Sequence, residues 1–291
     1  MTSEIPDRFI AAIGAVRPEL AGLPMRLHTE GWDSDAVEAG GTIFKFPKRP
    51  EAIPRLRKEA KILALLRPRV PLAVPDMRLH ETPELFSEHT KIPGDMIETP
   101  QYDMLSEAQR DAMAQTLAGF YAALHAIPVS EAKAAGAELN PGWPPASEIM
   151  QLVERTLEPA LHGWARAVLA AYDAIPPSET TFCYYDGHGW NMAFDHEHGV
   201  LDGVYDFADA GLGPRAKDFC YSSFISADLT ERLIGAYERA TTIMIDPRQV
   251  ALYTAIQRLA ELGAGAKERR WFVANVAQWH DYMQARAELR L

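Results

Sequence analysis

TFCYYDGHGWNMAFDHEHGVLDGVYDFADAG, residues 181–211, is the stretch that decides the fold. Two short apolar segments flank a polar turn at Asp195–Gly199, which predicts a β-hairpin. Asp186 and Asn191 lie in a glycine-rich loop before this hairpin, and Asp206 follows its second strand. Oxygen-bearing side chains on loops are ligands of Mg²⁺, although Asp and Asn are also common in ordinary turns. Taken together, the three side chains indicate a functional site.

A strand and a helix within the first 90 residues carry a second pair of polar side chains. The segment TIFKFP (42–47) alternates, so that Lys45 faces away from its two phenylalanines. Residues 52–66 repeat apolar side chains at helical spacing, with Glu59 on the same face. A carboxylate in an apolar stripe is costly unless it is paired, and Lys45 is the obvious partner. The alternative is that Glu59 turns to solvent at the edge of the stripe.

The chain divides near Pro93–Gly94, where a strand-like segment ends. Residues 1–92 read as a small lobe of mixed strand and helix, and residues 93–291 as a mainly helical lobe that contains the hairpin. A capping box that begins at Ser106 starts one helix of this second lobe. A long helical pattern covers residues from about 148 to 175.

Composition narrows the classes of protein to consider. The chain of 291 residues is 47% hydrophobic and 24% charged, which is typical of a globular protein with a sizeable core. No apolar run approaches the roughly 18 residues of a membrane span, and the N-terminus lacks the pattern of a signal peptide. Only two cysteines, Cys183 and Cys220, are present, which excludes a disulfide scaffold and suits the cytoplasm.

The net charge of the chain indicates which class of binding partner is favoured. A net charge of −11 argues against nucleic acid and mildly favours a cationic small molecule. Ordinary solubility charge is the alternative explanation. The sequence does not indicate an oligomeric state.

The order of the polar residues matches a known catalytic arrangement. The spacing D-x-x-x-x-N, then a hairpin, then D-F, is that of the catalytic and metal loops of protein kinases, and a strand lysine paired with a helix glutamate completes the set. The sequence resembles the aminoglycoside phosphotransferase family, a kinase-like group that also includes choline, homoserine and macrolide kinases. The segments that carry this resemblance are GWDSDAV, FKFPK, LRKEAKIL, TKIPGD, LAGFYAALHAIP, YYDGHGWN and DFADAGLGPRAKD, and some are most similar to the 2″-phosphotransferase branch.

The resemblance implies an α+β, two-lobed protein-kinase-like fold with a small antiparallel sheet and one helix in the first lobe. It implies an enzyme that uses ATP or GTP and Mg²⁺ to phosphorylate a hydroxyl of a small cationic molecule. An aminoglycoside is the first candidate for that molecule. The resemblance implies Asp186 as catalytic base or orienter, and Asn191 and Asp206 as magnesium ligands. It places Lys45 on the phosphates with Glu59 holding it, and Ser34 with neighbouring backbone N–H groups over the phosphates. Thr90 and Ile92 would meet the purine through their backbone, and Asp218 would be a structural brace of the catalytic loop.

Departures from the family pattern leave the acceptor open. Tyr184 and Tyr185 replace a usual His-Gly pair, and Tyr185 is expected either to narrow the substrate pocket or to alter the loop. Trp190 stands where the residue is usually small. The alternatives are therefore a kinase for a macrolide, a choline-like alcohol, a sugar or an amino acid such as homoserine, and a non-catalytic nucleotide-binding protein. Acids that could line a polyamine pocket are Glu238, Glu261 and Glu268, although the pattern favours solvated helix faces for most of them and singles out none.

Overall fold

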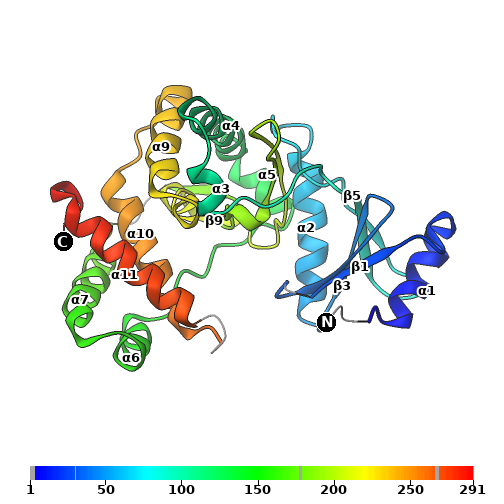
Figure 1. The fold of residues 1–291 in the computed structure, drawn as a ribbon, viewed down its shortest axis with the longest axis horizontal. Coiled ribbons are helices and arrows are strands. Elements are labelled where there is room, and N and C mark those ends of the chain that lie inside the picture. The colour runs from blue at the N-terminus through cyan, green and yellow to red at the C-terminus, as the bar shows by residue number, and fades with distance from the viewer. Residues whose placement is uncertain (1–3, 30, 177–178, 266–268, 291) are drawn as a thin grey trace.

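The computed structural model describes residues 4–29, 31–176, 179–265 and 269–290, and it has two lobes (Figure 1). The N-terminal lobe is built on an antiparallel sheet with the strand order β1-β2-β3-β5-β4. The strands are β1 (Met25–His28), β2 (Ser34–Ala39), β3 (Thr42–Pro47), β4 (Arg78–His80) and β5 (Phe86–Thr90).

The described residues of this lobe form two helices, one more than expected. Helix α1 (Asp7–Val16) packs Phe9 on Phe46 of β3, with ring centroids 4.0 Å apart. Helix α2 (Ala52–Leu66) lies beside the sheet toward the second lobe (Figure 1). The alternation predicted for β3 is confirmed, because its phenylalanines are buried with α1 while Lys45 reaches Glu59 of α2.

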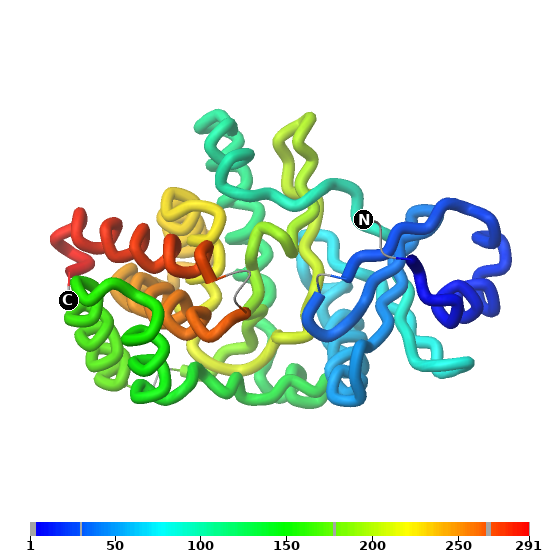
Figure 2. The backbone as a smooth tube through the Cα atoms, turned by 60° about the horizontal axis from the view of Figure 1, so that its bottom comes forward, coloured from blue at the N-terminus to red at the C-terminus, as the bar shows by residue number. Residues whose placement is uncertain are grey.

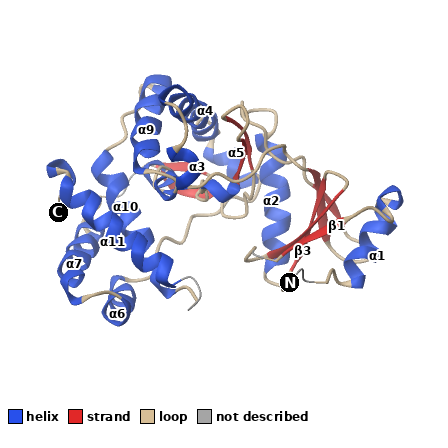
Figure 3. Ribbon diagram, viewed as in Figure 1, coloured by secondary structure: helices blue, strands red, loops and turns tan. Residues whose placement is uncertain are grey.

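The second lobe is mainly helical (Figure 3). Its helices are α3 (Thr99–Asp103), α4 (Glu107–His125), α5 (Val129–Ala134), α6 (Ala146–Thr156), α7 (Pro159–Asp173), α8 (Arg215–Asp218), α9 (Ala227–Thr241), α10 (Pro247–Ala260) and α11 (Arg269–Ala285). Short 3-10 turns include η2 (Gly189–Asn191), η3 (Tyr221–Phe224) and η4 (Glu261–Gly263). Within the described ranges, no helix combines the length and the apolar character that a membrane crossing needs.

The helical pattern expected from about 148 to 175 is confirmed as two helices, with a break between them. Helix α6 ends at Thr156, and Glu158 has an extended backbone before α7 begins. Proline lacks the N–H that a continuing helix would need, yet it fits the first helical position well. Pro159 therefore starts α7 and breaks the apolar repeat into two helices.

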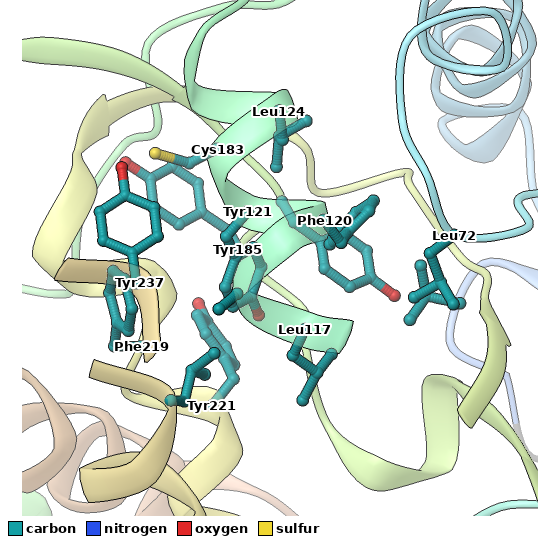
Figure 4. Close-up of a cluster of buried hydrophobic side chains, with 14 of the residues drawn as sticks. Leu72, Leu117, Phe120, Tyr121, Leu124, Cys183, Tyr185, Phe219, Tyr221 and Tyr237 are labelled. Atoms are coloured by element: carbon teal, nitrogen blue, oxygen red, sulfur yellow. The ribbon is translucent and has the colours of Figure 1, made fainter. Parts of the chain in front are cut away.

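The predicted hairpin is confirmed and lies where the lobes meet. Strands β7 (Met192–Asp195) and β8 (Val200–Val204) pair, and β6 (Thr180–Cys183) pairs with β9 (Gly211–Pro214). Figure 2 shows the chain around residues 200–215 running between the N-terminal lobe and the C-terminal helices. The large core beneath this stretch includes buried side chains of α4, drawn in Figure 4 beside Cys183 and Tyr185. The loops that carry the candidate site therefore extend from a well-packed hydrophobic core.

Candidate functional site

A lysine from the first lobe meets carboxylates from both lobes. Lys45 Nζ lies 2.9 and 3.0 Å from the two carboxylate oxygens of Glu59, and 3.3 Å from Asp206 Oδ1. Glu59 is 1% exposed, so the alternative that it turns to solvent is wrong. Its Oε1 also accepts a hydrogen bond of 3.1 Å from the backbone N–H of Phe207. Glu59 therefore links β3 to the segment that follows the hairpin.

The charge state of this cluster follows from its surroundings. Burial alone lowers the pKa of Lys45, but the neighbouring carboxylates of Asp206 and Glu59 outweigh that effect and raise it. Burial raises the pKa of Glu59, against the lowering effect of Lys45. Lys45 is thus a fixed positive charge placed between two acids, an arrangement suited to holding an anionic ligand where the two lobes meet.

Asp186 and Asn191 are joined directly. The side-chain Nδ2 of Asn191 donates to Asp186 Oδ2 at 2.7 Å and to the Asp186 carbonyl at 3.0 Å. Burial raises the pKa of the Asp186 carboxyl well above its usual range, and the charge of Asp206 raises it further. A carboxyl with a raised pKa is the kind of group that serves as a general base.

Asn191 and Asp206 suit a divalent cation that prefers oxygen ligands. The backbone N–H of Tyr205 donates to the Asn191 carbonyl at 3.0 Å, so the two segments lie side by side. Since Nδ2 of Asn191 is committed to Asp186, its Oδ1 is the atom that can ligate a cation. Asp206 has a left-handed backbone (φ 64°), and its side chain is 43% exposed. Strain of this kind, at a cost of about 1–3 kcal/mol, is typical of ligand-binding positions.

The remaining predicted nucleotide residues lie around the same sheet. Ser34 begins β2 and pairs with Pro47, the last residue of β3. Thr90 ends β5 opposite Thr42, and Ile92 packs its side chain closely on Gly203 of β8. Ser34 and Thr90 therefore lie on the two strands that flank β3, the strand of Lys45. Ile92 lies where the chain passes to the second lobe.

Asp218 braces the loop that carries Asp186. Its carboxylate accepts hydrogen bonds from the backbone N–H groups of Tyr184 (2.9 Å) and Tyr185 (2.6 Å), and it contacts His125 Nε2 at 2.9 Å. His125, Asp218 and Cys183 are close enough together to hold a metal. Both carboxylate oxygens already accept hydrogen bonds, however, and burial keeps the Cys183 thiol protonated by raising its pKa. This cluster is a structural brace.

The side chains of Tyr184 and Tyr185 are buried in the core of the second lobe. Tyr184 stacks on Phe207 at 4.5 Å, and Tyr185 adopts a left-handed backbone (φ 60°). The Tyr185 hydroxyl donates to the Pro214 carbonyl, and its ring is 2% exposed within the core of Figure 4. The expectation that Tyr185 narrows the substrate pocket is wrong, because its side chain points toward β9.

Aromatic side chains next to the catalytic loop are a feature that the sequence did not reveal. Trp190 stacks on His188 with centroids 4.0 Å apart, and His188 Nε2 lies 3.3 Å from Asp186 Oδ1. Trp190, Phe224 and Trp271, which we call the aromatic ledge, contact one another at centroid distances of 5.9–6.2 Å. The unusual size of residue 190 was the only available signal, because Phe224 and Trp271 come from distant segments.

Two of the three acids that could line a polyamine pocket make hydrogen bonds within the protein. The Glu238 carboxylate accepts a hydrogen bond from the backbone N–H of Ile245 at 2.8 Å. Glu261 Oε1 accepts a hydrogen bond from Gln257 Nε2 at 2.7 Å, and its Oε2 is buried. Glu268 lies outside the described residues.

Glu261 makes stability depend on pH. Burial raises the pKa of Glu261 to about 7 from its ordinary value of 4.5, so the folded protein binds this proton more tightly than the unfolded chain does. The free energy of unfolding should therefore fall as pH rises through that window. We expect Glu261→Gln to gain on the order of 2 kcal/mol over wild type at pH 8 and almost nothing at pH 4. Urea unfolding at both pH values measures this, with Glu238→Gln as the control; an equal difference at both pH values would refute it.

One arginine connects the lobes at the edge of the site. Arg55 of α2 binds the Asp33 carboxylate in the loop before β2, and its other nitrogen lies 2.7 Å from Asp209 Oδ1. Asp209 follows the Asp206 segment in the second lobe. The loop before β2 and the loop after β8 are thus tied to the same guanidinium.

Comparison with known proteins identifies the family of this chain. A sequence model of the "Phosphotransferase enzyme family" matches residues 24–253. The chain belongs to this family. It is a phosphotransferase, as predicted.

Solved structures that resemble this phosphotransferase support the same fold. The complex of APH(2″)-IIIa with GDP and kanamycin matches with a TM-score of 0.76 and 20% identity, covering 94% of this chain and 97% of that one. Macrolide 2′-phosphotransferase MphH from Brachybacterium faecium matches with a TM-score of 0.64 and 21% identity, covering 90% and 98%. The two-lobed, kinase-like α+β fold is therefore confirmed.

A relative in sequence also matches this phosphotransferase. "Uncharacterized protein YcbJ" of Bacillus subtilis (strain 168) is 28% identical over 209 residues, which cover 68% of each chain. The similarity extends over most of both proteins.

Proposed function

We propose that this phosphotransferase transfers the γ-phosphoryl group of ATP or GTP to a hydroxyl of a small cationic molecule, with an aminoglycoside as the first candidate. The observation that carries the proposal is the contact of Lys45 Nζ with Asp206 Oδ1 at 3.3 Å while Lys45 remains paired with Glu59. A cation from one lobe and an oxygen ligand from the other thus meet at one point, as phosphoryl transfer requires.

Asp186 is the proposed base. It takes the proton of the acceptor hydroxyl as that oxygen bonds to the γ-phosphorus and the bond to the nucleoside diphosphate breaks. Asn191 holds the Asp186 carboxylate through its 2.7 Å hydrogen bond. His188, whose pKa burial lowers to about 3, stays neutral beside it and adds no competing positive charge.

The nucleotide is held by the groups around Lys45. Lys45 neutralises the phosphates, Glu59 fixes its position, and Ser34 covers the phosphates from β2. Thr90 and Ile92 offer their backbone to the purine. Asn191 and Asp206 would hold Mg²⁺, which supplies charge neutralisation on the β- and γ-phosphates when bound. Positioning and charge neutralisation supply most of the rate in this class of reaction.

Two observations support a cationic acceptor. The chain carries a net charge of −11, which attracts cations over the whole surface. APH(2″)-IIIa was solved with kanamycin, and another similar structure is a ternary complex of streptomycin, ATP and APH(2″)-IIa. A macrolide, a choline-like alcohol, a sugar or homoserine is the alternative acceptor. We further propose a lobe boundary at 92/93 and a cytoplasmic location.

An acceptor panel tests the proposal. Purified protein is incubated with ATP or GTP and Mg²⁺, and nucleotide consumption is followed with kanamycin, a macrolide, choline, a hexose and homoserine. Turnover that depends on one acceptor, together with a phosphorylated product in the mass spectrum, is the expected result. Binding of nucleotide without turnover on any acceptor would instead favour a non-catalytic nucleotide-binding protein.

A further inference from the structure

We propose that the side-chain hydroxyls of Tyr184 and Tyr205 position the two proposed magnesium ligands and thereby set the affinity of the site for the metal. This inference rests on the proposed function, because it takes Asn191 and Asp206 as those ligands. Neither hydroxyl is proposed to touch the nucleotide or the acceptor, so both tyrosines are positioning residues. The role also gives a reason for Tyr184, which departs from the family pattern.

Tyr205 directs its backbone and side-chain hydrogen bonds to the catalytic loop. It directly precedes Asp206 in the chain. Its backbone N–H donates to the Asn191 carbonyl at 3.0 Å, and its hydroxyl donates to the Trp190 carbonyl at 2.8 Å. Its own carbonyl accepts a hydrogen bond from the Tyr184 hydroxyl. Three hydrogen bonds therefore connect the residue beside Asp206 to both ends of the catalytic loop.

The ring of Tyr184 holds the residue on the other side of Asp206. This ring is buried and stacks on Phe207 with ring centroids 4.5 Å apart. The backbone N–H of Phe207 also donates to Glu59 Oε1 at 3.1 Å. Asp206 therefore lies between two neighbours, Tyr205 and Phe207, that are both fixed by contacts with other segments of the chain.

The backbone of Asp206 needs this support. Its φ of 64° is uncommon for a residue other than glycine, and such conformations persist only where the surrounding structure imposes them. Without either hydroxyl, Asp206 can relax, and the separation of its carboxylate from Asn191 Oδ1 changes. Mg²⁺ demands near-ideal ligand geometry, and the groups that orient its ligands affect how tightly it binds. We therefore expect the loss to appear in the affinity for the metal.

The alternative is that the two hydroxyls only stabilise the fold, because a tyrosine hydroxyl within a packed region usually finds a partner. The two roles predict different results. A hydroxyl that only stabilises the fold changes the free energy of unfolding and leaves the metal affinity of the folded protein as it was. A hydroxyl that positions a ligand changes the metal affinity of the folded protein itself.

Metal and nucleotide binding to the full chain test this role without requiring turnover. The Kd of a non-hydrolysable ATP analogue is measured by calorimetry in EDTA and in Mg²⁺, and the Kd of Mn²⁺ is measured from its electron paramagnetic resonance signal with the analogue present. For Tyr205→Phe and Tyr184→Phe we expect the Kd of Mn²⁺ to rise on the order of tenfold. The Kd of the analogue in EDTA should stay unchanged.

The variants are chosen to keep the protein folded. Both substitutions retain the aromatic ring, and Tyr205 is only half-buried, so Tyr205→Phe serves as the test even if the buried Tyr184→Phe does not fold. Tyr282→Phe is the matched control, because it removes a hydroxyl that donates to Glu231 at 2.6 Å among the C-terminal helices. It should leave the Kd of Mn²⁺ and of the analogue unchanged.

Three results would overturn the positioning role. One is an unchanged Kd of Mn²⁺ in either folded variant. Another is an equal rise in the Kd of the analogue in EDTA, which would show that the hydroxyls act on the nucleotide or on the fold. The third is a wild type whose binding of the analogue does not respond to metal. Metal affinity that depends on the two hydroxyls, in a protein that transfers no phosphoryl group to any acceptor of the panel, would refute the proposed function and leave the positioning role in place.

Discussion

Asp186→Asn should bind nucleotide as wild type does and lose phosphoryl transfer by about two to four orders of magnitude, the usual contribution of a general base. The substitution keeps the shape of the side chain, so a hydrogen bond with Asn191 can persist. An amide cannot take the proton of the acceptor hydroxyl, so kcat should fall while the KM for nucleotide stays nearly constant.

Steady-state kinetics with the best acceptor of the panel and a fluorescent nucleotide titration measure the two quantities. Asp202→Asn is the matched control, because it makes the same change on β8 of the adjoining hairpin. Its kcat should remain within about twofold of wild type. Unchanged turnover in Asp186→Asn would reject the assigned base, and a loss of nucleotide binding of equal size would show that Asp186 acts on the nucleotide instead.

Asp218→Ala should destabilise the fold by about 3–5 kcal/mol. The fully buried carboxylate accepts the backbone N–H groups of Tyr184 and Tyr185 and contacts His125. Removing it leaves these donors buried without a partner, which costs their full desolvation. Urea unfolding measures the loss in the free energy of unfolding.

Asp195→Ala is the matched control for burial. Asp195 also accepts two backbone N–H groups, those of Glu197 and His198, but its side chain is 32% exposed. Water can replace those hydrogen bonds, so we expect a loss of about 1 kcal/mol or less. Similar losses in the two variants would contradict the view that the buried Asp218 carboxylate holds the catalytic loop.

The pairing of Lys45 with Glu59 could be predicted because it follows from a local rule. A carboxylate within an apolar helical face requires a cation, and the preceding strand supplied one with the right orientation. The hairpin followed from its two apolar segments and turn residues in the same way. Each of these inferences used residues that are close in sequence.

Contacts between distant segments could not be predicted in this way. Asp206 reaches Lys45 across 161 residues, and its left-handed backbone contradicts the ordinary preference of aspartate. The contact of Trp190 with Trp271 depends on where α11 begins, which the periodic pattern of the helix does not fix. The Tyr185 side chain takes its direction from a backbone with a positive φ angle, and nothing in the sequence predicts that angle.

The position of Arg55 has a consequence for the turnover cycle. Its guanidinium holds Asp33 ahead of β2 and Asp209 beyond β8, and the side chain is 39% exposed. Because Arg55 and Asp33 belong to the first lobe and Asp209 to the second, any separation of the lobes during the proposed reaction would have to break the ion pair with Asp209. Because solvent-exposed ion pairs are screened by dissolved ions, the ease of that opening depends on ionic strength. We therefore expect the release of nucleotide in the proposed reaction to depend on the salt content of the medium through this one side chain.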